Sequence, residues 1–325
     1  MRSRIFLIIA LFLMTAGPLF GQVDFLTEVE PAFQQFTDDI AVTLPYLSAV
    51  GLNWNDAYIG NFPHFAVGMS GGFATVPYDS IQDLATNLGA TSSILGSPFD
   101  SIGVPIPMWC LDGRLGGFGI PFDMGFKIGF LPEEAQVLLP KDMAFDYLMI
   151  GADFRLSLLQ DVGPTPDISI GIGATYLGGS VTVYNATPGT TINFAEGDVT
   201  IGAGDFFFDW QALTIDLKAQ VSKNIVFFTL SAGVAGSYSV YAEATGGVYA
   251  PISYTGTNEA TLEAAYSALG LSSNSFTVTG TANGWSFRAF GGIAFDLTII
   301  KIDLMGMYNI LSNALGATLN VRVQL

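Results

Sequence analysis

The chain ends in Gly316-Ala-Thr-Leu-Asn-Val-Arg-Val-Gln-Leu325, where apolar and polar residues alternate without interruption. Every second residue from Ala317 to Leu325 is apolar, and the residues between them are polar. Because successive side chains of a β-strand point to opposite faces, the pattern predicts a strand with two different faces. Such a strand suits a soluble sheet, whose apolar face meets a core, or an outer-membrane barrel, whose apolar face meets lipid.

The N-terminus favours export. Arg2 and Arg4 precede an apolar stretch from Ile5 to Met14, and small residues follow before Gln22. This order is typical of a secretory signal peptide, here predicted as residues 1–21. The apolar stretch is short for a membrane-spanning helix, which needs about 20 residues.

The composition excludes several classes of function. The net charge is −17, which argues against nucleic acid as a partner. Only 12% of the residues are charged, against about 25% in soluble domains, and 50% are hydrophobic. With one cysteine and one histidine, the chain has no disulfide framework and few means of binding a metal. We therefore predict no cofactor, no metal site and no catalytic residue.

The alternation of the C-terminal stretch recurs along the chain. Apolar faces about ten residues long suit a lipid band of about 25 Å. The opposite faces carry Gly, Ser, Ala and Thr together with nearly all of the strand charges, as an enclosed lumen would. The predicted lumen charges are Asp123, Lys127, Asp153, Arg155, Asp216, Lys218, Arg288, Asp296, Lys301, Asp303 and Arg322. Aromatic residues towards strand ends suggest interfacial girdles: Trp109, Trp210, Tyr241, Trp285 and Tyr308.

Loop lengths support an outer-membrane barrel formed by residues 64–325. If the C-terminus is periplasmic, long connections fall outside and short turns fall inside, as in bacterial barrels. Predicted short turns include residues 119–121, 222–224 and 298–299. The count is ten antiparallel strands, within a range of eight to fourteen, because the loops at 185–206 and 243–276 contain strand-like residues. The last strand would pair with the first, near residues 65–76, and both termini would be periplasmic.

Residues 22–63 do not alternate. Phe33, Phe36, Ile40 and Leu44 have helical spacing. We predict that this segment is a plug or a periplasmic lid, or else an ordered leader without a gating role.

Three motifs carry a resemblance to a known family. They are Gly51-Leu-Asn-Trp-Asn-Asp-Ala-Tyr-Ile-Gly60 with Pro63-His64-Phe65, Arg114-Leu-Gly-Gly-Phe118 with Pro121-Phe-Asp-Met-Gly-Phe-Lys127 and Leu131-Pro132, and Lys301-Ile-Asp-Leu-Met-Gly-Met-Tyr-Asn309. Together they resemble spirochaete outer-membrane proteins that are similar to the long-chain fatty-acid transporter (FadL-like) family. The resemblance implies a barrel with an N-terminal hatch that passes hydrophobic molecules. This chain is shorter than the fourteen-stranded transporters that define that family.

The function therefore stays open between three hypotheses. The first is passive uptake of hydrophobic solutes such as long-chain fatty acids, and the second is a general small-solute porin. The third is a structural or adhesion barrel that acts through loops 185–206 and 243–276. The lumen charges either filter solutes or form a structural network. His64 would lie at the periplasmic end, away from the outer rim, so we expect no enzyme. The expected partners are outer-membrane lipid, the outer-membrane assembly machinery and a hydrophobic solute.

Overall fold

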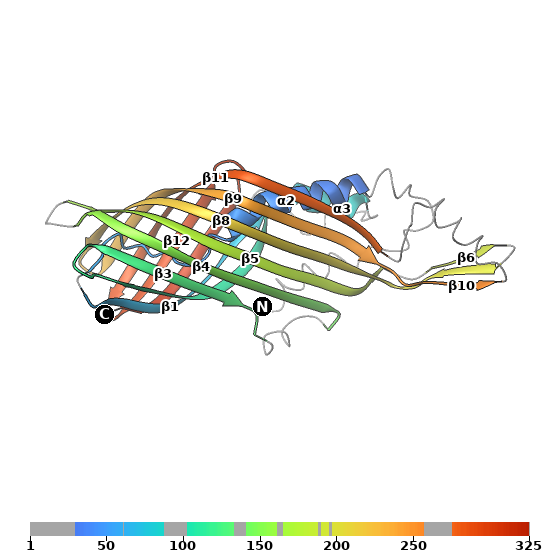
Figure 1. The fold of residues 1–325 in the computed structure, drawn as a ribbon, viewed down its shortest axis with the longest axis horizontal. Coiled ribbons are helices and arrows are strands. Elements are labelled where there is room, and N and C mark those ends of the chain that lie inside the picture. Colours follow the sequence, from blue (N-terminus) through green and yellow to red (C-terminus); the bar gives the residue numbers. More distant parts are fainter. Residues whose placement is uncertain are drawn as a thin grey trace.

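The computed structural model describes residues 30–60, 62–87, 103–132, 141–160, 165–187, 190–194, 197–256 and 275–324. Ten antiparallel strands close into a barrel in the order β1-β13-β12-β11-β9-β8-β5-β4-β3-β2 (Figure 1). The barrel strands are β1 (His64–Val76), β2 (Val104–Gly116), β3 (Phe122–Phe130), β4 (Met143–Leu159), β5 (Asp167–Thr187), β8 (Gly204–Ile225), β9 (Phe228–Tyr249), β11 (Ser275–Leu297), β12 (Ile300–Asn309) and β13 (Leu315–Gln324). The predicted ten-stranded outer-membrane-type barrel is confirmed.

The C-terminal stretch closes the barrel as predicted. Strand β13 pairs with β1 from Ala66↔Gln324 to Ala74↔Gly316, so neither strand is left as an unpaired edge. The turns that join β2 to β3, β8 to β9 and β11 to β12 lie at the end where Gln324 lies. We call it the short-turn end, and the opposite end the long-loop end.

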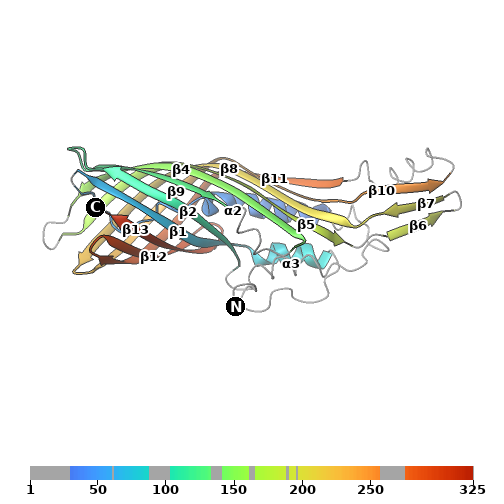
Figure 2. The same cartoon turned by 90° about the horizontal axis from the view of Figure 1, so that it is seen from below.

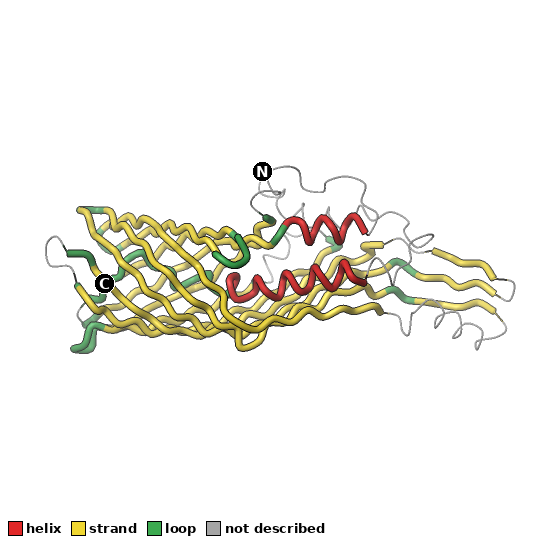
Figure 3. The backbone as a smooth tube through the Cα atoms, turned by 90° about the horizontal axis from the view of Figure 1, so that it is seen from above, coloured by secondary structure: helices red, strands yellow, loops and turns green. Residues whose placement is uncertain are grey.

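Two helices and a small sheet complete the described elements. Helix α2 (Glu30–Leu47) packs against the inner faces of β11, β9 and β8, and α3 (Tyr78–Asn87) packs on α2 (Figures 2 and 3). Strands β6 (Thr190–Phe194), β7 (Gly197–Ile201) and β10 (Ile252–Gly256) form a separate sheet beyond the long-loop end. The strand-like residues of the two long loops thus form this sheet and add no strand to the barrel. None of the described helices is long and apolar enough to cross a membrane.

The N-terminal segment runs through the barrel. Gln34 of α2 donates a hydrogen bond to the Thr279 carbonyl, near the long-loop end of β11. After Leu47 the chain continues as a coil, and the Phe62 amide finally bonds the Gly117 carbonyl at the short-turn end. Glu30, the first described residue, therefore lies towards the end opposite Gln324. The predicted signal peptide and periplasmic N-terminus lie outside the described residues.

The two faces of the long strands exchange character part-way along their length. On β8 the outward residues from Leu213 to Val221 are apolar, and the inward ones from Thr214 to Ser222 are polar. Towards the long-loop end the pattern reverses: Phe206 and Phe208 point inward. Outward positions there are polar on five neighbouring strands: Asp146, Ser180, Asp209, Gln211, Glu243, Thr245 and Thr279.

This exchange divides the barrel into two parts. One part, with an apolar outside and a polar inside, has the faces of a lipid-embedded barrel; we call it the membrane half (Leu213–Ile225 on β8). The other, with a polar outside and an apolar inside, has the faces of a water-soluble sheet; we call it the extension (Gly204–Ala212 on β8). Strands β4, β5, β8, β9 and β11 carry the extension, which projects past β12 and β13 (Figure 2).

The exchange corrects several sequence predictions. Strands β8 and β9 extend beyond the predicted loop boundaries at residues 206 and 243. Trp210, predicted for an exterior girdle, instead contacts the interior apolar cluster. The short turn predicted at residues 222–224 is wrong, because pairing continues to Ile225↔Phe228 and the turn is Val226–Phe227. The turn at 298–299 is as predicted, and the turn predicted at 119–121 lies within the connection 117–121.

The membrane half makes a testable prediction about charge tolerance. Leu217 lies near the middle of the outward apolar band, whereas Gln211 lies outward on the same strand in the extension. We expect Leu217→Arg to lower the free energy of unfolding in phospholipid vesicles by about 2–4 kcal/mol, and Gln211→Arg to lower it by less than about 1 kcal/mol. Guanidinium titration of both variants measures the difference. Equal losses would contradict the division of the barrel.

Candidate functional site

The lumen of the membrane half is lined by charged side chains. The eleven residues predicted from the sequence all lie on the inner face of the wall, where each bonds another side chain or the coil that follows α2. Six of them are almost wholly buried: Asp123, Lys127, Arg155, Arg288, Asp303 and Arg322. The arrangement is therefore a bonded network and not a row of solvated charges.

The ion pairs form between strands. Asp123 pairs with Arg155, the residue that faces it on β4, at 2.5 Å. Facing residues on neighbouring strands are about 5 Å apart, whereas residues two apart on one strand are separated by about 7 Å. Asp216 on β8 pairs at 2.6 Å with Arg288 on β11, which reaches it across β9, and not with Lys218 on its own strand.

Residues 48–60, which we call the plug coil, fill the space inside this ring of charges. Wall side chains satisfy its backbone amides: Asp112 accepts from Leu52 (2.9 Å), Asp303 accepts from Asn55 (2.9 Å) and Ser222 accepts from Ala57 (2.8 Å). Other wall side chains donate to its carbonyls: Lys127 to Ser48 and Val50, Arg114 and Lys218 to Leu52, Gln220 to Trp54, Arg155 to Asp56, and Gln160 to Ile59. A coil provides few backbone partners of its own, so the wall takes the place of secondary structure.

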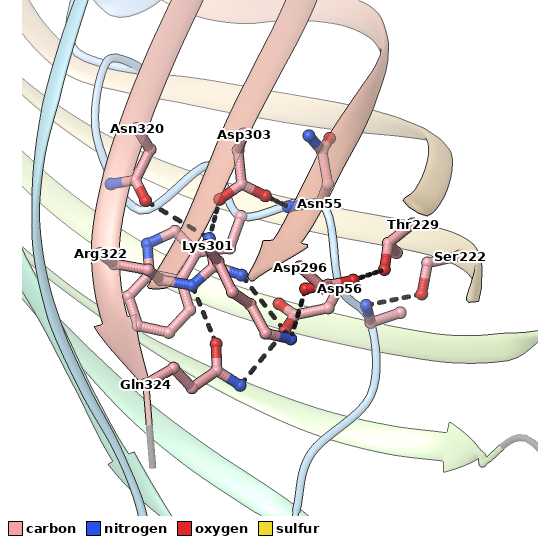
Figure 4. Close-up of polar contacts among 12 residues, drawn as sticks. Asn55, Asp56, Ser222, Thr229, Asp296, Lys301, Asp303, Asn320, Arg322 and Gln324 are labelled. Atoms are coloured by element: carbon pink, nitrogen blue, oxygen red, sulfur yellow. Dashed lines mark hydrogen bonds and ion pairs between the residues drawn. The ribbon is translucent and has the colours of Figure 1, made fainter. Parts of the chain in front are cut away.

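Asp56 is the charged anchor of the plug coil (Figure 4). Its carboxylate lies 3.0 Å from Lys301 and 3.2 Å from Arg322, and Gln324 donates to it at 3.3 Å. This carboxylate is buried, and the two cations beside it favour its charged form. The plug coil is thereby joined by charge to β12 and β13.

Trp54 occupies the centre of the plug coil. It is fully buried, and the guanidinium groups of Arg114 and Arg322 lie 5.1 Å and 4.4 Å from its ring. These distances allow cation–π attraction from two sides of the lumen. The buried indole ring thus gives both guanidinium groups a favourable contact in place of water.

Three residues of this network were not among the predicted lumen charges: Asp56, Asp112 and Arg114. Asp112 and Arg114 have the inward parity of β2, next to the outward Leu111 and Leu115, and this parity was a signal that could have found them. Asp56 lies outside any alternating stretch, so no periodicity marks it.

His64 joins the charged network at the short-turn end. It is buried at the short-turn end, with its Nε2 3.6 Å from Asp123 and its Nδ1 accepting from the Gly60 amide. Asp123 is already held by Arg114 and Arg155. Within the described ranges, no group of three or more His, Cys, Asp or Glu residues is placed to hold a metal ion.

An apolar cavity of about 140 Å³ lies in the extension, between α2, α3 and the barrel wall. Its lining includes Leu44 from α2, Leu84 from α3 and Met108, Leu177 and Phe208 from the wall. Leu47 also lines it, directly before the plug coil begins. The cavity therefore lies above the polar plug, on the side of the long loops.

Close approach of α2 to the wall shapes this cavity. A Cβ atom at Gly280 would lie 2.4 Å from the Asp38 amide nitrogen, so only glycine admits the helix there. The opposite side of α2 is tied to α3, because the Ser80 hydroxyl donates to Asp39. Helix α2 is thus held between β11 and α3.

Comparisons with known proteins extend to the fold alone. No family model matches the sequence, and no curated protein matches it. Solved structures similar to this one include the outer-membrane protease OmpT from Escherichia coli (10% identity, TM-score 0.36, covering 82% of this chain and 99% of that one). Two others are the attachment invasion locus protein Ail of Yersinia pestis (10%, 0.23, 80% and 95%) and the monoaromatic hydrocarbon channel CymD (9%, 0.23, 95% and 97%).

The charged anchor predicts that Asp56→Asn loosens the plug coil. Removing one partner of a buried ion pair costs about 3–5 kcal/mol, and the loss falls on the coil because Arg322 and Lys301 keep Asp303 and Asp296. We expect the variant to conduct ions in planar bilayers at least several times more than the parent chain. The matched control is Asp146→Asn, an exposed outward carboxylate of the extension. A variant as closed as the parent would contradict the anchoring role.

Proposed function

We propose that this protein binds apolar solutes at the cavity in its extension and passes them across the outer membrane. The supporting observation is the lining of the cavity, which consists of apolar and aromatic side chains from α2, α3 and five barrel strands. An apolar inner surface that projects from the membrane into water suits capture of molecules that water solvates poorly. The same surface offers little to ions or sugars.

The volume of the cavity limits the size of the solute that it can hold in this structure. An apolar cavity of about 150 Å³ holds a benzene molecule, and this cavity has about 140 Å³. A single aromatic ring or the end of an acyl chain fits this volume. A long-chain fatty acid, the solute that the family resemblance implies, would bind with one end of its acyl chain in the cavity.

The plug coil bears on the alternative functions. It occupies the lumen below the cavity through many hydrogen bonds, which argues against a permanently open small-solute porin. Passage of a solute therefore requires the coil to move. A role in adhesion through residues 185–206 and 243–276 remains a separate hypothesis, to which the projecting sheet of β6, β7 and β10 gives a surface.

We also propose the surroundings in which this function operates. The outward apolar band of the membrane half suits outer-membrane lipid, and insertion would depend on the outer-membrane assembly machinery that reads C-terminal strands such as β13. The long-loop end would face outward, since short turns are periplasmic in bacterial barrels. The role is non-enzymatic, in keeping with His64, which is buried beside Asp123.

Filling the cavity tests the proposal. Val181 lines it, and Val181→Trp places an indole in its volume; Val234→Trp makes the same change on the lipid-facing side of β9. Burial of an aromatic ring is worth about 1.5–3 kcal/mol. We therefore expect Val181→Trp to weaken binding of a single-ring ligand such as toluene, measured by calorimetry, at least about tenfold, and to reduce uptake of a fluorescent fatty acid into liposomes.

The control for folding is the shift in electrophoretic mobility on heating, which reports an intact barrel in both variants. Val234→Trp should bind and transport like the parent chain. Unchanged binding by a folded Val181→Trp would refute the cavity as the site.

A further inference from the structure

The turns at the short-turn end carry large exposed apolar side chains. Val226, in the turn between β8 and β9, is 86% exposed, and Phe227 beside it is 51% exposed. Ile120 in the β2–β3 turn is 59% exposed, and Ile299 in the β11–β12 turn is 50% exposed. Short turns that stand in water are usually built from polar residues, Gly and Pro. Each of the three turns at the short-turn end that the structure describes completely nevertheless exposes at least one large apolar side chain.

The end of the plug coil belongs to the same surface. Phe62 is 59% exposed and packs on Phe118, with ring centroids 4.9 Å apart. We call Phe62, Phe118, Ile120, Val226, Phe227 and Ile299 the apolar rim. Its members come from turns distributed around the barrel, because β3, β8 and β12 are not neighbours in the barrel order. The rim is continuous with the outward apolar band, since Phe122 stacks on Phe154 at 5.3 Å just above it.

The distance of the turns from the end of the outward apolar band places this rim beside a membrane surface. A tilted strand descends about 2.5 Å per residue, so a band of about 25 Å takes about ten residues. Counted from Leu213, where the outward face of β8 becomes apolar, the band ends near Lys223, whose ammonium donates to the Thr165 carbonyl. The turn lies about three residues further. Three residues descend about 7.5 Å, and the headgroup layer of one leaflet is about 5–7 Å thick, so the turn lies at the outer boundary of this layer, within side-chain reach of it.

We propose that the apolar rim is seated in the headgroup layer of the leaflet at the short-turn end, with phospholipid as its partner. A lipid surface surrounds a barrel equally on all sides, which matches a rim distributed around the circumference. A protein partner would match a patch on one side. Apolar and aromatic side chains at this depth contact the upper acyl segments while their backbones remain near the headgroups.

This seating has a consequence for the exit from the barrel. The plug coil leaves the lumen beside Phe62 and Phe118, so its outlet opens at the membrane surface and not into bulk water. An apolar solute that passes the coil meets lipid first. The seating itself does not depend on the proposed function, and only this consequence rests on it.

Site-directed spin labelling tests the seating in the full chain. Cys110, the one cysteine of the chain, is buried and is replaced by Ser. Single cysteines then replace Val226 or Ile120, with Val234→Cys as the lipid-facing control and Gln211→Cys as the water-facing control. The labelled proteins are placed in vesicles of phosphatidylethanolamine and phosphatidylglycerol, with a water-soluble nickel complex on both sides. Power saturation measures collisions of each label with nickel and with oxygen.

The proposal predicts that labels at 226 and 120 collide with nickel several times less often than the label at 211, and with oxygen at a frequency between those of the labels at 211 and 234. Nickel collisions as frequent as at 211 would overturn it, since the rim would then stand in water. Protection at only one of the two turns would also overturn it, because it would indicate a one-sided protein contact. The readout is independent of solute binding, so it separates this proposal from the proposed function.

Discussion

The structure depends on one constraint: a coil without secondary structure fills a lumen from which most water is excluded. An unsatisfied buried backbone group costs about 1–3 kcal/mol. Each buried amide and carbonyl of residues 48–60 that has no partner within the coil therefore needs one on the wall. Asp112, Asp303 and Ser222 accept, while Lys127, Arg114 and Gln220 donate. The lumen is therefore polar because the backbone of the plug coil needs hydrogen-bond partners there. Cross-strand pairs such as Asp123–Arg155 then neutralise the charges that this task requires.

The exchange of faces along the long strands places a second environment above the first. In the membrane half the wall binds a polar coil, and in the extension it binds an amphipathic helix through apolar contacts. The chain of α2 and the plug coil passes from one environment to the other at Leu47, where the cavity lining ends. A solute held by Leu44 and Leu84 thus lies directly above the residues that would have to move. The segment of α2 and the plug coil would therefore both hold the solute and close the lumen.

The sequence predicted the wall better than its contents. Period-two alternation in stretches such as Ala317–Leu325 is a local property, so strand number, closure and the inward side of residues such as Arg322 followed from it. The partner of each charge depends on the register between strands, which a single strand does not reveal. The pairing of Asp123 with Arg155 therefore did not follow from the sequence. The apolar inner face of Phe206 and Phe208 was missed. Apolar and polar residues still alternate there, but the apolar residues point inward instead of outward. Asp56 was missed because an irregular coil has no period.

Backbone hydrogen exchange along the plug coil tests the central claim most directly. If wall side chains hold the amides of Leu52, Asn55 and Ala57 as the structure has them, peptides that cover residues 50–60 should exchange as slowly as strand β13 in the folded barrel. Denatured chain gives the unprotected reference. Exchange of these peptides at the rate of the unprotected reference, while β13 remains protected, would contradict the account, since the coil would then be solvated and the lumen charges would serve another purpose.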